Sequence, residues 1–166
     1  MQRKIVIIAN NLRSAHNVGS LLRTADGIGV ERIYLTGYTP YPIAPQDKRL
    51  PHIAQRAEKL IAKTALGAEH TVRWHHEDSV ADVITTLKQD GYAVCALEQA
   101  ETAIEIAKYH VPKKIALILG NEVAGIDQQT LALVDTCLEI PMFGGKESYN
   151  VTQATAMALY HCRFMS

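Results

Sequence analysis

Four polar side chains that could serve a ligand gather directly after the first apolar run of the sequence. They are Asn11, Arg13, Asn17 and Arg23. The apolar run reads as a strand, and open α/β sheets bind their ligands beyond the carboxyl ends of their strands. This segment therefore lies where a binding or catalytic site is expected.

A helix over about His16–Ile28 would turn Arg23 away from the core. The apolar side of its helical wheel holds Val18, Leu21, Leu22, Ala25 and Ile28. Arg23 falls almost opposite that side, with Gly19 one turn before it, so it is expected to point out over a surface cleared of bulk. An exposed arginine without a function shows the same pattern, and Asn17 could be only a helix cap.

A second segment, Ile115–Ile126, runs from a buried strand into a glycine turn that carries an amide and a carboxylate. Gly120 would let a ligand approach the backbone closely. Glu122 could orient a cation or a hydroxyl, or it could only favour the positive end of the following helix. Gly-Asn-Glu alone leaves these alternatives open.

A third segment, Ile140–Val151, leads into the last helix. Gly144 and Gly145 permit a tight loop, and either Ser148 or Asn150 can cap the helix that follows. The side chains of Ile140 and Met142 could line a slot for an adenine ring or belong to the core.

Other chemistries lack their sequence signatures. No G-x-G-x-x-G follows a strand, and no nucleophile elbow is present. His75 and His76 have no third ligand at metal spacing, so a surface pair is expected and no metal site. The three cysteines are widely spaced among apolar neighbours and are expected to be reduced, buried thiols.

Alternating short and long segments must position these residues. The expected strands are 4–9, 32–35, 69–74, 92–97, 115–119 and 137–140, and the expected helices are 16–28, 53–66, 79–89, 128–134 and 150–164. This alternation is typical of an α/β fold with a mostly parallel sheet flanked by helices. Residues 38–51 contain four prolines and are expected to form an extended surface loop that could face a substrate.

The composition fits one cytoplasmic domain. The chain has 166 residues, 48% of them hydrophobic, with a formal net charge of zero. No apolar run approaches the roughly 18 residues that span a membrane, and no signal peptide is recognised at the start. Bulk charge does not favour a nucleic-acid partner. Local basic clusters exist at Lys48–Arg49 and at Arg56, Lys59 and Lys63, where a solvated helix face is an equal interpretation.

The three segments together resemble the motifs of the SpoU (TrmH-like) branch of the SPOUT RNA methyltransferases. Residues 11–25 resemble its Asn-x-Arg-x-x-x-Asn-x-Gly-x-x-x-Arg-x-Ala motif. Residues 119–125 resemble its Leu-Gly-Asn-Glu-x-x-Gly, and residues 140–151 its Ile-Pro-Met-x-Gly…Ser-x-Asn-Val. The likeness covers nearly the whole chain, 1–166, which it implies is a single methyltransferase domain with no appended RNA-binding domain.

The resemblance implies a C-terminal deep trefoil knot in the α/β fold and a homodimer whose active site takes residues from both subunits. It also implies transfer of a methyl group from S-adenosylmethionine to a ribose 2′-hydroxyl of tRNA or rRNA, which leaves S-adenosylhomocysteine. The cofactor would contact Leu97, Gly120, Ile140, Met142, Ser148 and Tyr149. Tyr149 replaces a leucine often found in the family, and its contribution would come mainly from backbone.

By the same resemblance, the catalytic set would be Arg23, Asn17, Glu122, Ser148 and Asn150. RNA contacts are expected from Arg13, Arg23, Lys48 and Arg49. A guanidinium with a pKa above about 12 is a poor base. Arg23 is therefore either a strongly perturbed base assisted by a substrate phosphate, or a clamp on that phosphate. A base-directed methyltransferase and a non-catalytic RNA-binding module remain the alternatives.

Overall fold

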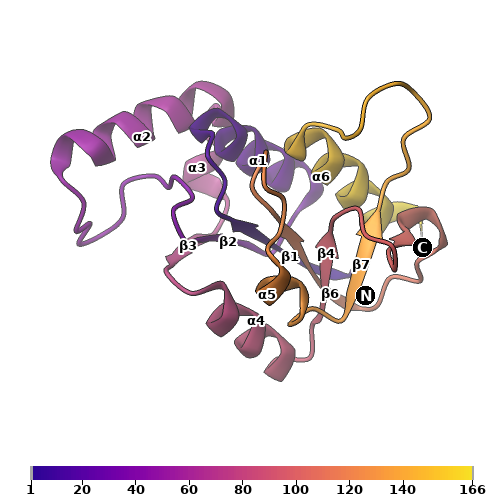
Figure 1. Cartoon of the computed structure of the whole chain (residues 1–166). Helices are drawn as coiled ribbons and strands as arrows, with labels where there is room; N and C mark the ends of the chain where they lie inside the picture. Colours follow the sequence, from indigo (N-terminus) through magenta and orange to yellow (C-terminus); the bar gives the residue numbers. More distant parts are fainter. Residues whose placement is uncertain (1, 166) are drawn as a thin grey trace.

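A parallel sheet of seven strands forms the centre of the protein, as a computed structural model that describes residues 2–165 shows (Figure 1). The strands are β1 (Lys4–Asn10), β2 (Arg32–Thr36), β3 (Trp74–Glu77), β4 (Ala93–Leu97), β5 (Ile104–Glu105), β6 (Lys114–Leu119) and β7 (Thr136–Glu139). The helices are α1 (Ala15–Ile28), α2 (Pro51–Ala65), α3 (Ala68–Thr71), α4 (Val80–Gln89), α5 (Gln128–Leu131) and α6 (Val151–Tyr160). A short 3-10 helix (Ile106–Lys108) and a π-helical turn (His161–Met165) complete the chain.

The order of the strands creates a crevice at one edge of the sheet. The order is β3-β2-β1-β6-β4-β7-β5, and every pair of neighbours is parallel. All carboxyl ends therefore lie at the same edge, called the carboxyl edge below. The order reverses direction between β1 and β6, and ligands of open α/β sheets bind at such a switch point. The loops after β1 and β6 carry the first two candidate segments.

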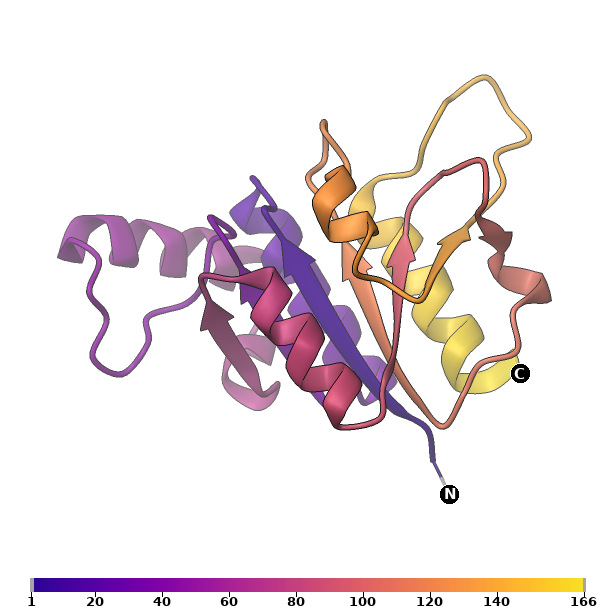
Figure 2. The ribbon, with the colours of Figure 1, turned by 60° about the horizontal axis from the view of Figure 1, so that its bottom comes forward.

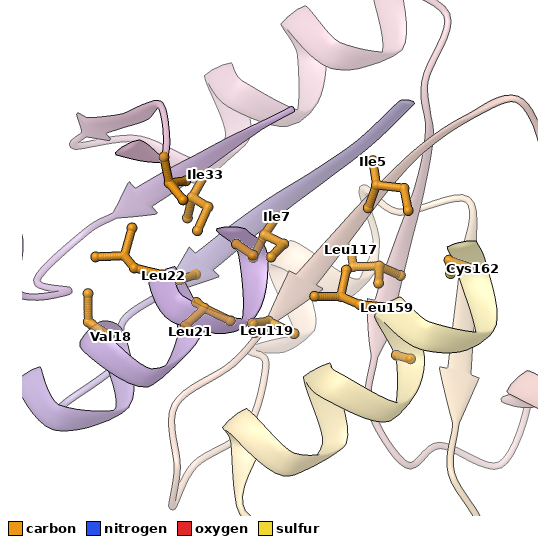
Figure 3. Packing of buried hydrophobic residues seen from close by; sticks show 14 of the residues in the cluster. Ile5, Ile7, Val18, Leu21, Leu22, Ile33, Leu117, Leu119, Leu159 and Cys162 are labelled. Atoms are coloured by element: carbon orange, nitrogen blue, oxygen red, sulfur yellow. The ribbon is translucent and has the colours of Figure 1, made fainter. Parts of the chain in front are cut away.

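Alternating side chains of the central strands fill two separate cores, because successive residues of a strand face opposite sides of the sheet. Ile5 and Ile7 of β1 pack under α1 and α6, together with Leu117 of β6 (Figure 3). Val6 and Ile8 face the other side, where α4 covers the sheet (Figure 2). The continuous apolar runs of β1 and β6 are the expected signature of buried parallel strands.

The expected α/β fold with its parallel sheet is confirmed, and one expected strand is wrong. Residues 69–74 were assigned to a strand, whereas the chain forms the helical turn α3 and then enters β3 only at Trp74. Glu69 accepts a hydrogen bond from the backbone N–H of Gly67, and its carbonyl oxygen accepts one from the Trp74 indole. These local bonds favour the turn over an extended chain. The expected helix 128–134 is also shorter, ending at Leu131.

Two smaller expectations also change. Cys95 and Cys162 are free and buried as expected, but Cys137 is only half-buried. The expected surface pair of histidines is divided, since His75 is exposed while His76 is half-buried and bonds the carbonyl oxygen of Gly37.

Gly19 lies at the crossing of α1 and α2, which corrects the expectation of a cleared surface beneath Arg23. It is buried, and a Cβ atom added there would lie 2.2 Å from the carbonyl oxygen of Ile61 and 2.2 Å from Oγ1 of Thr64. The hydroxyl of Thr64 also donates to the carbonyl oxygen of His16, at 2.8 Å. The missing side chain therefore allows the backbones of the two helices to approach closely.

We expect Gly19→Ala to lower the free energy of unfolding by about 2 kcal/mol, because the added methyl group must separate α1 from α2. Gly27→Ala is a matched control on the same helix, since its added Cβ would meet no atom within 4 Å. That control should be neutral or should stabilise by up to about 1 kcal/mol, the helix propensity gained over glycine. Urea denaturation measures both changes, and equal stabilities of the two variants would contradict this account of the crossing.

Candidate functional site

A cavity of about 630 Å³ opens at the carboxyl edge, beyond β4, β6 and β7. It collects most of the residues predicted to bind the cofactor: Leu97, Gly120, Ile140, Ser148 and Tyr149. Three predicted catalytic residues line it, namely Ser148 again, Glu122 and Asn150. The described residues that line it do not include Met142, Asn17 or Arg23. This space is called the first cavity below.

Glu122 joins the second candidate segment to the first. Its carboxylate accepts hydrogen bonds from the backbone N–H groups of Arg13 (2.8 Å) and Ser14 (3.1 Å) and from the side-chain amide of Asn17 (2.9 Å). These donors belong to the N-terminal end of α1, where the helix dipole favours a negative charge. The expected link to a positive helix end is therefore real, but the helix is α1 and not the one that follows Glu122.

The hydrogen bonds also set the ionisation of Glu122. Partial burial by itself raises its pKa, but the bonds from Arg13, Asn17 and Ser14 outweigh burial, and the pKa lies below its ordinary value of 4.5. Glu122 is therefore a fixed anion at neutral pH and is poorly suited to accept a proton. Its hydrogen bonds instead fix the position of the loop after β1.

Asn17 follows Ser14, which is the actual N-cap of α1. The hydroxyl of Ser14 accepts from the backbone N–H of Asn17 at 3.2 Å, while the Asn17 amide reaches Glu122. Asn17 therefore does not have the cap role. Its side-chain amide donates a hydrogen bond to Glu122, which lines the first cavity.

The turn after β6 is closed tightly on itself. A Cβ atom added to Gly120 would lie 2.5 Å from the backbone carbonyl carbon of Gly125 and 2.6 Å from Cγ1 of Ile126. Asn121 bonds the backbone N–H groups of Val123 and Ala124 through its side-chain oxygen. Gly120 is therefore required by the turn itself, which is a different reason from the ligand approach that we expected.

Glu98 and Gln99 are polar lining residues that were not predicted from the sequence. Glu98 accepts from the backbone N–H of Ile126 at 3.0 Å, which attaches the turn after β6 to the end of β4. Gln99 donates its side-chain amide to the carbonyl oxygen of Glu147, at 2.8 Å, and so contacts the third segment. Both directly follow a predicted strand, and that position at the carboxyl edge was the signal that could have identified them.

The third segment forms the outer wall of the first cavity. Asn150 is the N-cap of α6, and its side-chain oxygen accepts from the backbone N–H of Thr152 at 2.9 Å. Of the two cap candidates, Asn150 is therefore the one used. Ser148 and Tyr149 line the cavity, whereas Phe143 in the same segment is 95% exposed.

Arg23 is exposed on α1, as the helical wheel predicts. Within residues 2–165 its guanidinium makes no hydrogen bond or ion pair, and it does not line the first cavity. The chain thus presents a free guanidinium outward and does not bring it to its own cavity.

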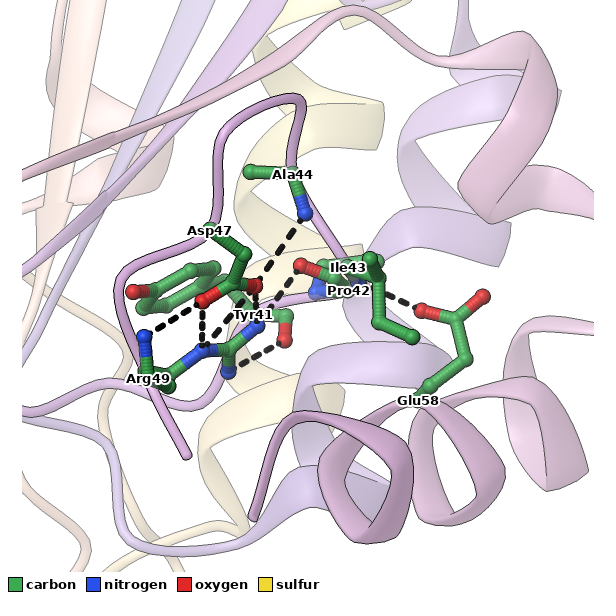
Figure 4. A network of polar contacts seen from close by, with 7 residues as sticks. All are labelled: Tyr41, Pro42, Ile43, Ala44, Asp47, Arg49 and Glu58. Carbon is green, nitrogen blue, oxygen red and sulfur yellow. Dashed lines mark hydrogen bonds and ion pairs between the residues drawn. The ribbon is translucent and has the colours of Figure 1, made fainter. Parts of the chain in front are cut away.

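Arg49, one of the residues expected to contact RNA, has several partners within the chain. It forms an ion pair with Asp47 at 2.5 Å, donates to the carbonyl oxygens of Tyr41 and Pro42, and lies 3.5 Å over the Tyr41 ring (Figure 4). The hydrogen bonds from Arg49 hold the pKa of Asp47 well below its ordinary value. Arg49 therefore holds the proline-rich loop together, while Lys48 beside it is exposed.

A comparison with known protein families identifies the family of this chain. The model of the SpoU rRNA Methylase family matches residues 4–160. The chain belongs to the SpoU family. The first cavity therefore lies among the three segments whose resemblance to SpoU motifs was noted from the sequence.

The sequence identity to individual relatives is low. The SpoU chain is 25% identical over 162 residues to the tRNA (guanosine(18)-2′-O)-methyltransferase of Escherichia coli K12, covering 98% of this chain and 64% of that protein. It is 29% identical over 159 residues to the 23S rRNA (guanosine-2′-O-)-methyltransferase RlmB of Neisseria meningitidis serogroup B, covering 96% of this chain and 58% of that protein. The chain thus spans less than two thirds of the length of these relatives.

Solved structures share the SpoU fold. An AdoMet-bound rRNA methyltransferase from Sinorhizobium meliloti superposes with a TM-score of 0.81 at 21% identity, covering 100% of this chain and 59% of that one. A structure concerned with 2-OH methylation of C/U34 on tRNA superposes with a TM-score of 0.75 at 22% identity, covering 96% of this chain and 94% of that one. At these identities the likeness establishes the fold.

Residues 2–165 lack two kinds of feature. No helix in this range combines the length and apolar character needed to cross a membrane. The same residues contain no group of three or more His, Cys, Asp and Glu side chains arranged to hold a metal ion.

Proposed function

We propose that the protein transfers a methyl group from S-adenosylmethionine to a ribose 2′-hydroxyl of tRNA or rRNA. The observation that carries the proposal is the first cavity, where the second and third SpoU-like segments meet and to which Glu122 ties the first. The names of the curated relatives, tRNA and rRNA 2′-O-methyltransferases, support the same reaction.

The residues of the first cavity fit S-adenosylmethionine. Its volume of about 630 Å³ lies within the usual range for ligand sites. Leu97 and Ile140 offer apolar surface for a purine, and Glu98 and Glu139 bring negative charge suited to a sulfonium. When bound, S-adenosylmethionine supplies an electrophilic methyl group on a positively charged sulfur.

The chain's own residues must align the ribose and remove its proton. Methyl transfer forms a carbon–oxygen bond and breaks a carbon–sulfur bond, so the hydroxyl proton must leave to a base or to solvent. Glu122 is held ionised by its donors and stays a positioning residue in this scheme. Arg23 is the proposed catalytic residue, either as the proton acceptor or as a clamp on a substrate phosphate that orients the ribose.

The outward position of Arg23 supports a composite site in a homodimer. Because Arg23 does not line the first cavity of its own subunit, its guanidinium could reach the cavity of a partner subunit. We propose this arrangement, together with a C-terminal trefoil knot, one catalytic domain over residues 1–166 and a cytoplasmic location. Sedimentation velocity tests the dimer, and a monomer at assay concentrations would contradict the shared site.

The reaction is tested in two steps on the full chain. Isothermal titration calorimetry with S-adenosylmethionine should give saturable binding, and Ser148→Trp, which fills the first cavity, should abolish it. Total RNA treated with the enzyme and labelled cofactor is then digested to nucleosides and analysed by mass spectrometry. A methyl group on ribose supports the proposal, a methyl group on the base indicates a base-directed enzyme, and no cofactor binding indicates a non-catalytic RNA-binding module.

A further inference from the structure

A second cavity of about 510 Å³ lies between the proline-rich loop, the start of α1 and the side of α2. Its lining includes Arg13, Tyr38, Tyr41, Arg56 and His76. In Figure 1 the loop that follows β2 extends out beside α2, away from β4 and β7. Two of its arginines, Arg13 and Arg49, were expected to contact RNA, but the methyl transfer proposed above uses no residue of this cavity.

The second cavity is positively charged. Arg13 and Arg56 are exposed, and within residues 2–165 neither guanidinium makes an ion pair or a hydrogen bond. The third arginine of the lining, Arg49, is neutralised by Asp47. None of the described lining residues is Asp or Glu. Two uncompensated guanidinium groups therefore favour an anion such as a phosphodiester.

The second cavity also offers an aromatic face. The Tyr41 ring is already covered by the guanidinium of Arg49, and it stacks on His76 with ring centroids 4.0 Å apart. Tyr38 has neither partner, and 63% of its surface is exposed. Its hydroxyl accepts a hydrogen bond from the side-chain amide of Asn121 at 2.9 Å, which anchors the ring. An anchored, exposed ring beside free guanidinium groups is the combination that binds single-stranded nucleic acid.

The walls of the second cavity are preformed. The contacts of Arg49 hold the loop from Tyr41 to Asp47 (Figure 4). The carboxylate of Glu58 on α2 accepts from the backbone N–H of Ile43 at 2.7 Å and fixes the loop to the helix. A ligand therefore meets an ordered site, and binding does not have to order the loop.

The two cavities meet along a common boundary. Tyr38 of the second cavity bonds Asn121 of the first, and Arg13 of the second donates its backbone N–H to Glu122 of the first. The two cavities are therefore neighbours on the surface of the protein.

We propose that the second cavity binds a nucleotide of the substrate RNA other than the methylated one, with its base stacked on Tyr38 and its phosphates held by Arg13 and Arg56. This inference rests on the proposed function for the identity of the ligand as RNA. It assigns the proline-rich loop as a nucleotide-binding element.

The test compares two fluorescein-labelled single-stranded RNAs of equal length and charge, one of mixed sequence and one with abasic residues at every second position. Fluorescence anisotropy should show that the wild-type chain binds the base-bearing RNA about tenfold more tightly, because a stacked base contributes that order of affinity. Tyr38→Ala should remove this preference, and Tyr38→Phe should keep it, since the ring remains. Arg56→Gln should weaken binding of both RNAs and lower the salt dependence by about one phosphate contact.

Lys59→Gln is the matched control, because it removes one charge from the same helix outside the second cavity. It should change both affinities by less than Arg56→Gln does. Equal binding of the two RNAs by the wild-type chain, or an unchanged preference in Tyr38→Ala, would overturn the proposal. Calorimetry with S-adenosylmethionine on the same samples separates the two ideas: a chain that prefers base-bearing RNA but binds no cofactor retains this site and loses the proposed methyl transfer.

Discussion

Arg23→Ala is expected to reduce turnover at saturating RNA by at least about 100-fold, the usual contribution of a group that moves or controls a proton in the transition state. Binding of S-adenosylmethionine should be unchanged, because Arg23 does not line the cavity of its own subunit and is proposed to act on the RNA in the partner's cavity. Steady-state kinetics with labelled cofactor gives kcat and KM separately. A higher KM for RNA with an unchanged kcat would assign Arg23 to phosphate binding alone. An unchanged kcat in Arg23→Ala or Arg23→Lys would contradict a catalytic role.

Arg73→Ala is a suitable control for the loss of an exposed arginine. Arg73 immediately precedes β3, so it lies at the edge of the sheet opposite to the first cavity. Its removal subtracts the same charge from the molecule. Turnover within about twofold of the wild type is expected, as for surface substitutions away from functional features.

Mixing two inactive variants tests whether Arg23 acts across the proposed dimer. Arg23→Ala retains an intact first cavity, and Ser148→Trp retains Arg23 but blocks its own cavity. If Arg23 acts on the partner's cavity, random exchange of subunits should restore about a quarter of the wild-type activity, since half of the dimers are mixed and each has one complete site. If Arg23 acts within its own subunit, the mixture stays inactive.

Glu122→Ala is expected to lower the free energy of unfolding by about 3 kcal/mol. The substitution leaves the backbone N–H groups of Arg13 and Ser14 and the amide of Asn17 without their acceptor. Hydrogen bonds to a charged group contribute about 1.5–3 kcal/mol each, and of these three the bond from Arg13 is exposed while the other two are partly buried. Because the first cavity and the loop after β1 lose their connection, cofactor affinity should fall as well, by about tenfold.

The contribution of Glu122 should depend on pH in a defined direction. Its pKa is lower in the folded protein than the ordinary value of 4.5, so its stabilising effect is complete above pH 4.5 and is lost as the pH falls through the folded pKa. Glu122→Gln removes the charge and keeps one acceptor oxygen. The difference in free energy of unfolding between the wild type and Glu122→Gln should therefore be constant near neutral pH and should shrink below pH 4.5. A difference that grows on acidification would contradict the assignment.

Much of the site was predictable because its residues directly follow strands. Gly120 and Leu97 were placed from the sequence and from the family resemblance, and both line the first cavity. Met142 was placed by the same reasoning but does not line it, because the loop between β7 and α6 has no ladder that fixes its course. Glu98 and Gln99 were missed, although they follow β4 directly.

The sequence did not reveal which contacts require certain residues at their positions. Gly19 was interpreted as clearing space beneath Arg23, but it is small because α2 crosses there. The RNA contact expected of Arg49 stays a prediction, but its contacts with Asp47 and the Tyr41 ring were not foreseen. In both cases the decisive neighbour is a packing or loop contact for which the sequence has no periodic signal.

By itself, the sequence determined the family, the parallel α/β architecture and the outward direction of Arg23, because apolar periodicity and motif spacing are local properties of the chain. The tertiary structure decided which segments meet. Glu122 contacts Asn17 across 105 positions of sequence, and Tyr38 contacts Asn121 across 83. Such contacts arise because parallel strands bring their carboxyl ends to one edge, and the order of the strands, which no local pattern encodes, selects which loops become neighbours.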